Sequence, residues 1–202
     1  MSTRGPRGPY RKSADKRQQI LDAALTAYAE AGSRKVTVRD IAERVGMTDA
    51  GVVHHFGGRE ALLTAVLAAR DAADAATYGD LGTASPADLL TNNARTPGLV
   101  KLFVDLAAAA AEPEHPAHDF FTERYTHLRT RIADSLESYT PTSPGPAADT
   151  DPAWTARILL AAVDGLQLQW LLNPEIDMAG DIETLCEVLL AALPDRQPAP
   201  ER

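Results

Sequence analysis

Residues 37–56, TVRDIAERVGMTDAGVVHHF, are the stretch on which the interpretation of the whole chain rests. Thr37 followed three residues later by Asp40 has the pattern of a helix N-cap. The residues after this cap place one apolar face over two helical turns, at Ile41, Ala42 and Val45. A short helix is therefore predicted to begin directly after Thr37.

A tight turn and a second short helix follow. Gly46 can adopt the left-handed conformation that ends a helix, and Thr48 can cap a second helix that runs to about His55. Two short helices joined by a tight turn with a glycine form a helix-turn-helix, whose second helix enters the major groove of DNA. Residues 37–56 therefore predict a DNA-binding motif.

Helices this short are marginal in isolation, so they need packing partners on both sides. Apolar residues recur at helical spacing from residue 14 to residue 31, at Ile20, Ala24, Tyr28 and Ala31. After Gly57-Gly58 another helix opens at Arg59, with an apolar side made by Leu62, Leu63, Val66 and Leu67. The region 14–74 is therefore predicted to be one compact helical domain around the helix-turn-helix.

The stretch TVRDIAERVGMTDAGVVHHFGGREALLTAV is similar to the N-terminal DNA-binding domain of TetR-type transcriptional regulators. The resemblance covers residues 14–74 and is carried by Thr37, Ile41-Ala42, Gly46, Thr48, His55-Phe56, Arg59 and Leu62. The chain departs from the family's pattern with Ala50 for the usual Gly, Val53 for the usual Tyr and Arg59 for the usual Lys. A Tyr at position 53 would offer a hydroxyl to a phosphate. With Val53 in its place, this phosphate contact is made by His54 or His55 or is absent.

The net charge of −8 is divided unevenly along the chain. Residues 1–70 contain 12 Lys and Arg against 7 Asp and Glu, a net charge of +5, whereas residues 71–202 contain 8 against 21, a net charge of −13. A basic first third favours phosphate binding, and the acidic remainder is repelled by DNA. The alternative is an ordinary solvated surface, but the helix-turn-helix favours a nucleic-acid partner.

Composition indicates a folded protein of the cytoplasm. The chain has 202 residues, of which 45% are hydrophobic, so it can bury a sizeable core. Cys186 is the only cysteine, so no intrachain disulfide can form, and its apolar neighbours predict a buried position in a helix. No apolar run is long enough to span a membrane, and the basic N-terminus lacks the apolar core of a signal peptide. We expect a cytoplasmic protein without membrane contact.

The predicted DNA contacts come from helix starts and from the outer face of the second helix. Backbone N–H groups at a helix start attract phosphates, and side chains opposite the Val52/Phe56 core face approach base edges. Asp49 either accepts a hydrogen bond from a cytosine amino group or stabilises the helix N-terminus, and the structural role is favoured. The full predicted set is Thr37, Arg39, Thr48, Asp49, Ala50, Gly51, Val53, His54, His55 and Arg59.

The first 13 residues are expected to be a disordered basic arm. They contain two Gly-Pro pairs together with Arg4, Arg7, Arg11 and Lys12, and Lys16 and Arg17 follow closely. Such an arm can lie along DNA phosphates or enter the minor groove. A solubilising tail without a further role is the alternative.

The second part of the chain also reads as helical. Pro after a capping residue marks helix starts at Ser85-Pro86, Thr96-Pro97, His115-Pro116 and Asp151-Pro152. These signals predict helices at 86–94, 97–111, 116–138 and 152–172, with another near 179–193. The fold class is therefore all-α with about nine helices. An effector-binding and dimerisation domain spans 75–194, a flexible loop lies at 141–151 and a disordered tail at 195–202.

The helix at 152–172 is apolar on most of its circumference, so more than one side must be buried. One stripe is Trp154, Ile158, Ala161, Gly165, Leu168 and Leu172; the other is Leu159, Val163, Leu166 and Trp170. Both stripes can serve one core, or one can face a second subunit. The family resemblance implies a homodimer through the last two helices. Two recognition helices about one DNA turn apart, roughly 34–36 Å, then predict a palindromic operator.

A ligand pocket is predicted between the bundle helices, with a filled core as the alternative. Its candidate residues are Leu102, Phe103, Leu106, Phe121, Tyr125, Gln167 and Trp170. The resemblance implies a small-molecule effector of unspecified identity. Binding of that effector is expected to move the helix at 59–76 as a lever and to release the operator.

Catalysis, cofactors and a metal site are not expected. His54 and His55 diverge by roughly 100° on a helix, and His118 and His127 fall on different helical faces. The chain has no Gly-rich phosphate loop, HExxH, nucleophile elbow or CxxC sequence. We therefore expect a sequence-specific regulator, more specifically a repressor. The alternative is a helical dimerisation or adaptor protein that no longer binds specific DNA.

Overall fold

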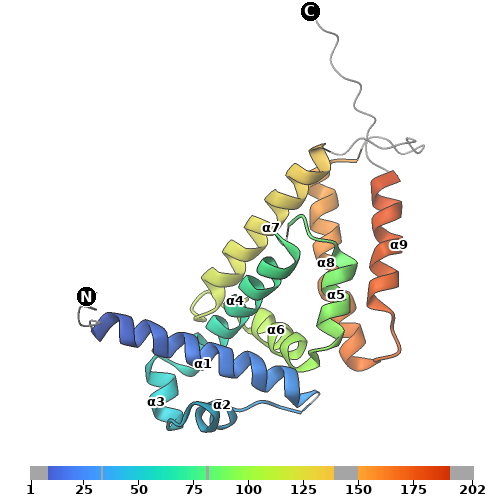
Figure 1. Cartoon of the computed structure of the whole chain (residues 1–202). Helices are drawn as coiled ribbons and strands as arrows, with labels where there is room; N and C mark the ends of the chain where they lie inside the picture. Colours follow the sequence, from blue (N-terminus) through green and yellow to red (C-terminus); the bar gives the residue numbers. More distant parts are fainter. Residues whose placement is uncertain (1–8, 33, 81, 139–149, 192–202) are drawn as a thin grey trace, which may run out of the picture. The chain divides into compact units, whose positions relative to one another are not determined.

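The computed structural model describes residues 9–32, 34–80, 82–138 and 150–191. Within these ranges the chain forms nine helices and no strand, so the all-α prediction is confirmed (Figure 1). None of these helices is long and apolar enough to cross a membrane. The helices are α1 (Pro9–Ala31), α2 (Val38–Val45), α3 (Asp49–His54), α4 (Arg59–Tyr78), α5 (Pro86–Ala94), α6 (Pro97–Ala109), α7 (His118–Ser138), α8 (Pro152–Leu172) and α9 (Met178–Ala191).

Most helix boundaries agree with the sequence signals. The bounds of α5 and α8 are those predicted, and Asp151 caps α8 by accepting a 3.0 Å hydrogen bond from the backbone N–H of Ala153. The prediction for α7 was wrong by two residues. His115 and Pro116 lie in a turn, where the backbone N–H of His118 donates to the carbonyl of His115 at 2.9 Å.

The first helix begins earlier than the predicted arm allows. α1 begins at Pro9, so residues 9–13 are helical rather than part of a disordered arm. Residues 1–8 lie outside the described residues, as do the predicted tail 195–202 and nearly all of the predicted loop 141–151. The basic residues near the start of the chain do not prevent a helix, because Arg and Lys have good helix propensity.

The chain divides into two compact units. Unit 1 is Met1–Ala73 with Arg95–His118, and unit 2 is Asp74–Ala94 with Asp119–Arg202. α6 therefore packs with the helix-turn-helix region, although its residues fall inside the predicted domain 75–194. A close approach explains this packing: a Cβ added at Gly98 would lie 3.2 Å from Cδ1 of Tyr28 in α1. The predicted functional boundaries at 14–74 and 75–194 stay a prediction.

Unit 1 is built on α1, which packs against α2 and α6, while α2 packs against α3. The apolar positions predicted to support the short helices are buried except Ala31, which is half-buried, and Ile20, Ala24, Leu62 and Val66 have no exposed surface. α2 and α3 contribute Ile41, at 1% exposure, and Val52, at 0%. Burial of these side chains supplies the stability that two short helices lack on their own.

Unit 2 is a bundle in which α5 packs against α8 and α9, and α8 packs against α9. The two stripes of α8 have different environments. Leu159 and Trp170 of one stripe are buried, whereas Trp154, Leu168 and Leu172 of the other have exposures of 40%, 47% and 80%. One side of α8 thus completes the core of unit 2, and the other side presents apolar side chains outward.

Candidate nucleic-acid interface

The start of α2 is fixed by a complete capping box. The Thr37 hydroxyl accepts from the backbone N–H of Asp40 at 3.2 Å, and the Asp40 carboxylate accepts from the backbone N–H of Thr37 at 2.8 Å. Val36 and Ile41, on either side of this box, are both buried, as in a hydrophobic staple. These hydrogen bonds, led by the one from the Thr37 backbone, lower the pKa of Asp40. α2 therefore begins where the sequence predicted.

The turn between α2 and α3 depends on Gly46. This residue has φ 64°, in the left-handed region. The backbone N–H of Met47 donates to the carbonyl of Ala42 at 2.9 Å, and that of Gly46 donates to Glu43 at 3.4 Å. Together these bonds form a Schellman motif, which satisfies the last carbonyl groups of α2. The turn thus sets the direction in which α3 leaves.

α3 and its two capping residues, Thr48 and His55, carry seven of the ten predicted DNA contacts. Thr48 caps it by accepting from the backbone N–H of Gly51 at 3.1 Å, and Val52 and Phe56 hold its inner face at 0% and 8% exposure. On the remaining surface, Thr48, Asp49, Ala50 and His54 are exposed, while Gly51, Val53 and His55 are half-buried. The predicted residues of this helix therefore share its outer surface.

The two capping threonines differ in what they can still donate. The Thr37 hydroxyl already donates to the Asp40 carboxylate at 2.8 Å, so its proton is used within the chain. The Thr48 hydroxyl accepts a hydrogen bond from a backbone N–H and donates to none of the described residues. Its proton is therefore available to an acceptor such as a phosphate oxygen. Thr48 is therefore the better hydroxyl donor of the two.

The two arginines of the predicted set are exposed and paired with neighbouring carboxylates. Arg39 lies 2.9 Å from Glu43, and Arg59 lies 2.6 Å from Glu60. The pKa of Arg39 is raised mainly by its hydrogen bond to Glu43 and by the Glu43 charge, and to a smaller extent by the carboxylate of Asp49. Exposed pairs of this kind are weak, so these guanidinium groups can exchange their partners for phosphates at little cost.

Two cations in α1, which the predicted contact set did not include, each contact the carboxyl end of one helix of the helix-turn-helix. Lys16 Nζ donates to the carbonyl of Val45, the last residue of α2, at 3.5 Å. Arg17 Nη1 donates to the carbonyl of His55, directly after α3, and the Arg17 guanidinium lies 4.2 Å above the Phe56 ring. A cation at a helix C-terminus is favourable for the helix dipole, and the stack adds a cation–π interaction. No local sequence signal connects residues so far apart.

The seven candidate pocket residues are divided between the units. Leu102, Phe103 and Leu106 of α6 are buried in unit 1. Phe121 and Tyr125 belong to unit 2, with ring centroids 6.2 Å apart, as do the buried side chains of Gln167 and Trp170. None of the seven lines the cavity described below for unit 2.

Polar side chains pair inside unit 2. The Tyr125 hydroxyl donates to the Asp164 carboxylate at 2.5 Å, Asn92 Nδ2 donates to Asp74 at 3.1 Å, and Asn93 Nδ2 lies 3.5 Å from the Gln167 amide oxygen. Burial raises the pKa of Asp164, and burial together with the nearby Asp164 charge raises that of Tyr125. The interior of this bundle is therefore partly polar.

The histidines do not gather around a common point. His115 lies 3.9 Å from Glu60, His118 Nδ1 lies 2.9 Å from the carbonyl of Ala110, and His127 is exposed on α7. No group of three His, Cys, Asp or Glu side chains with metal-binding geometry occurs in the described ranges.

Comparison with known proteins identifies the family. Residues 20–66 match the model for bacterial regulatory proteins of the tetR family, and residues 84–195, more than half of the chain, match the C-terminal model for BetI-type transcriptional repressors. A TetR transcription regulator from Haloarcula marismortui has the same fold, with a TM-score of 0.66 at 17% identity over 89% of this chain and 98% of that one.

Curated relatives match over shorter stretches. The HTH-type transcriptional repressor KstR2 of Rhodococcus jostii is 40% identical over 52 residues, which are 26% of each chain. The repressor AcnR of Corynebacterium diphtheriae is 33% identical over 117 residues, 58% of this chain and 47% of that protein. The matched stretches thus span less than half of either relative. On the family models, the chain belongs to the TetR family of bacterial regulatory proteins.

Proposed function

We propose that this chain is a transcriptional repressor that binds a palindromic operator as a homodimer and leaves it when a small-molecule effector binds. The observation that carries the proposal is the helix-turn-helix itself. Both helix starts are capped, the turn is closed by a Schellman motif, and α3 is anchored through Val52 and Phe56. Its outer surface is thereby held in one orientation, which base readout requires.

The proposed contacts divide into two groups. Arg39, Arg59 and the Thr48 hydroxyl would contact phosphates, together with backbone N–H groups at the helix starts near Thr37 and Asp49. The outer residues of α3 would face base edges, where Ala50 and Val53 suit thymine methyl groups and His54 suits a hydrogen-bond acceptor. Gly51 would allow close approach of the backbone, and His55 would complete the surface.

We infer the dimer from the exposed stripe of α8. Leu168 and Leu172 of α8 and Val188 of α9, which has an exposure of 62%, are large apolar side chains left open to solvent. Apolar side chains exposed together in this way indicate an interaction surface. A two-fold axis through α8 and α9 would bury them between two subunits, and a palindromic operator would then be read by two copies of α3 about 34–36 Å apart. A protein that acts on bacterial DNA would work in the cytoplasm. The proposed mechanism includes no catalytic step.

The proposal is tested by binding to DNA from upstream of the protein's own coding region. Fluorescence anisotropy across a salt series should show saturable binding that Thr48→Ala and Arg59→Ala each weaken, by roughly 1–2 kcal/mol or up to about 30-fold. Lys101→Ala, which removes an exposed cation paired with Asp105 on α6, is the matched control and should bind normally.

The result against the proposal is equal affinity for operator and unrelated DNA, with no site recovered from a genomic library. That outcome would favour the adaptor alternative, in which the α8–α9 surface functions without specific DNA binding.

A further inference from the structure

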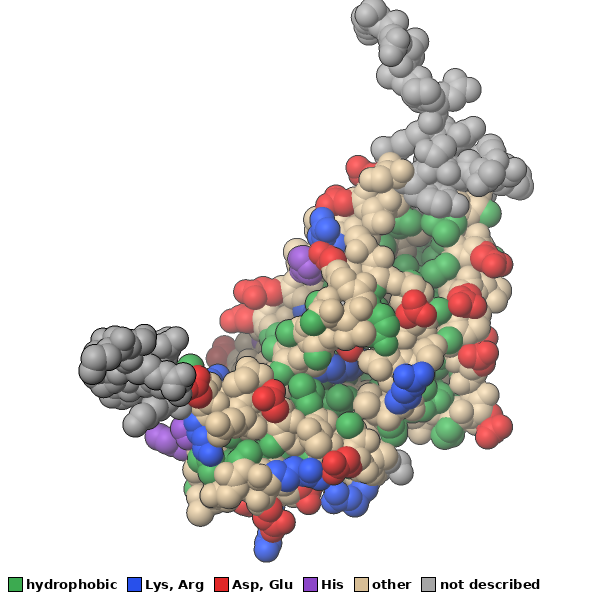
Figure 2. Space-filling view, in the orientation of Figure 1, with side chains coloured by type: hydrophobic (Ala, Val, Ile, Leu, Met, Phe, Trp, Pro, Cys, Tyr) green, Lys and Arg blue, Asp and Glu red, His purple; other side chains and the backbone are tan. Residues whose placement is uncertain are grey.

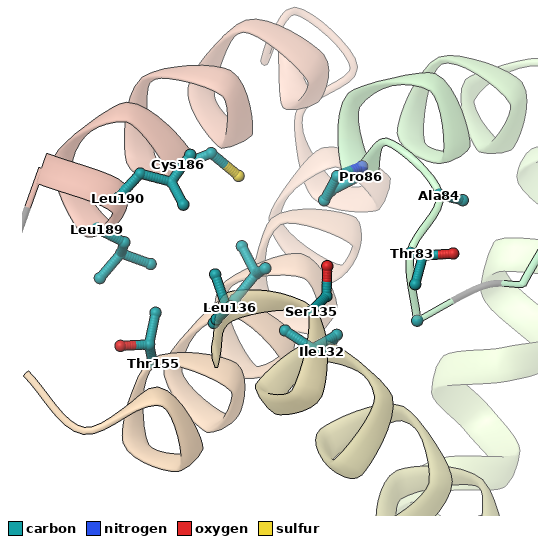
Figure 3. A pocket seen from close by; sticks show the side chains of 12 residues that line it. Thr83, Ala84, Pro86, Ile132, Ser135, Leu136, Thr155, Cys186, Leu189 and Leu190 are labelled. Atoms are coloured by element: carbon teal, nitrogen blue, oxygen red, sulfur yellow. The ribbon is translucent and has the colours of Figure 1, made fainter. Parts of the chain in front are cut away.

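Unit 2 contains a cavity of about 170 Å³ between four elements (Figure 3). Its helical walls use residues three or four apart, which lie on one face of each helix. The main apolar contributions are Ile132 and Leu136 of α7, Leu159 of α8, and Leu190 of α9. Cys186 of α9 also lines the cavity, and Figure 3 shows it facing the same space.

The fourth wall is formed by residues 82–84 and by Pro86 at the start of α5, and Gly82 is held against α7. The Asp80 carboxylate accepts from the backbone N–H of Gly82 at 2.9 Å and from Arg131 Nε of α7 at 3.0 Å. A Cβ added at Gly82 would lie 2.2 Å from Cβ of Arg131, so only glycine allows this approach. These contacts hold Gly82 against α7 before any ligand arrives, which reduces the entropic cost of binding at this wall.

The chemistry of the lining favours uncharged molecules. None of the described residues that line the cavity is charged. The hydroxyls of Thr83 and Thr155 already donate to the carbonyls of Asp80 and Asp151, at 3.1 and 3.2 Å. The Ser135 hydroxyl lies at the exposed mouth of the cavity, faces its space in Figure 3, and has no hydrogen-bond partner among the described residues. A charged group placed here would lose its hydration without gaining a counter-ion.

We propose that this cavity binds a small, uncharged and mainly apolar molecule, about the size of a substituted benzene, with one hydrogen-bonding group directed at Ser135. The size follows from the volume, since an apolar cavity of about 150 Å³ accommodates benzene. The inference deepens the proposed function and rests on it only where the bound molecule is called the effector. It assigns the ligand to the α5, α7, α8 and α9 walls rather than to the seven residues predicted from sequence.

Cys186 provides a built-in reporter because it is the only cysteine in the chain. Burial and the nearby Glu183 raise the pKa of its thiol, so it stays protonated at neutral pH and reacts slowly. Alkylation of the full chain by N-ethylmaleimide would be followed by intact mass spectrometry, with benzyl alcohol, benzoate and benzylamine as probes. Saturating benzyl alcohol should slow alkylation by about tenfold, because protection grows with ligand concentration over Kd, and the two charged probes should not.

Filled variants locate the site independently of the thiol chemistry. Cys186→Phe and Leu136→Trp each place an aromatic ring in the cavity, and each should abolish the saturation-transfer NMR signal of benzyl alcohol. Thr130→Trp adds the same bulk at an exposed position of α7 and should keep the signal. Circular dichroism identifies the filled variants that fold, and either one suffices.

Two results would overturn the proposal: protection by benzyl alcohol no greater than by benzoate, or a wild-type NMR signal in a folded, filled variant. The assays contain no DNA, so failure to bind an operator would leave their outcome unchanged and would count against the proposed function alone.

Discussion

The two compact units distribute polar and apolar side chains in opposite ways. Unit 1 has no large apolar side chain with high exposure among its described residues, and its charged side chains there are exposed or half-buried, with Arg70 as the exception. Among the described residues, unit 2 exposes large apolar side chains and buries polar ones. Its α8 and α9 hold all four large apolar side chains with high exposure, and it holds four of the five buried polar side chains, Asp74, Asn93, Thr155 and Gln167.

This difference indicates what each unit needs from outside. Unit 1 leaves no large apolar side chain highly exposed among its described residues, and caps at Thr37 and Thr48 fix the starts of α2 and α3. Unit 2 leaves apolar surface uncovered and keeps polar groups and a cavity inside, so it has features that a partner and a ligand would complete. Figure 2 also shows that Asp and Glu are the charged side chains on the visible face of α9, which suits a surface that avoids DNA.

The largest effect should come from charging the exposed stripe of α8. Leu168→Glu with Leu172→Glu would place two carboxylates in the proposed dimer interface, where their desolvation is costly. We expect a monomer in analytical ultracentrifugation and a loss of operator affinity of at least about 100-fold, or roughly 2.7 kcal/mol. Thr126→Glu with Thr130→Glu adds the same charge on the exposed side of α7 and should stay dimeric. If the α8 variant stayed dimeric, the exposed stripe of α8 would not be the dimer interface.

Two glycines of unit 2 separate internal packing from the proposed interface. Gly82→Ala should lower the free energy of unfolding by about 1–3 kcal/mol, because its Cβ would overlap with Arg131. Gly165→Ala has nothing within 4 Å and should raise helix stability by roughly 0.5–1 kcal/mol. If α8 pairs closely with its copy, Gly165→Ala should nevertheless weaken dimerisation, as measured by sedimentation. Equal effects of both changes on urea unfolding would contradict this assignment.

Arg17 tests whether unit 1 is held together from α1. Arg17→Ala removes the hydrogen bond to the His55 carbonyl and the stack on Phe56, and we expect operator affinity to fall by about tenfold, or roughly 1.4 kcal/mol. Because Arg17 would act by positioning α3, the slope of log affinity against log salt should stay unchanged. Arg17→Lys should restore part of the loss. A slope reduced by about one would instead indicate a direct phosphate contact.

Local signals account for the parts of the structure that were predicted well. The caps at Thr37 and Thr48 and the Gly46 turn each involve residues within five positions of one another, so sequence spacing alone specifies them. Pro at the first helical position marks α5 and α8 for the same reason. The signal failed at Pro116, where the backbone N–H of Ala117 donates to His115 Nδ1 at 3.2 Å and a turn replaces the first turn of the helix.

Features that depend on distant residues were missed. Arg17 and His55 are 38 positions apart, and each looked ordinary in its own segment. The cavity of unit 2 draws on α7 and α9, whose lining residues have the spacing of any core face. The aromatic residues of the predicted pocket, such as Phe121 and Trp170, are buried and lie outside this cavity, and their role in ligand binding stays a prediction. Hydrophobic periodicity identifies which face of a helix is covered, but not where two covered faces leave a gap.

The smallest expected effect concerns two carboxylates, one in each unit, whose pKa values shift in opposite directions. Asp164 has a raised pKa because it is buried, so the folded state favours its protonated form and loses stability as the pH rises from about 3.9 through the folded pKa. Asp40 has a lowered pKa because Thr37 donates to it, so its contribution is present above about pH 3.9 and is lost as the pH falls through the folded pKa.

Isosteric amides give a matched test of this contrast. In urea unfolding from pH 3 to pH 7.5, Asp164→Asn should gain stability relative to the wild type as the pH rises, because it removes a buried charge while keeping an acceptor for Tyr125. Asp40→Asn should lose stability over the same range, by a small amount because the group is near solvent. Shifts of the same sign in both variants would mean that the interior of unit 2 is as well hydrated as the surface of unit 1, and that its buried polar pairs cost the bundle little.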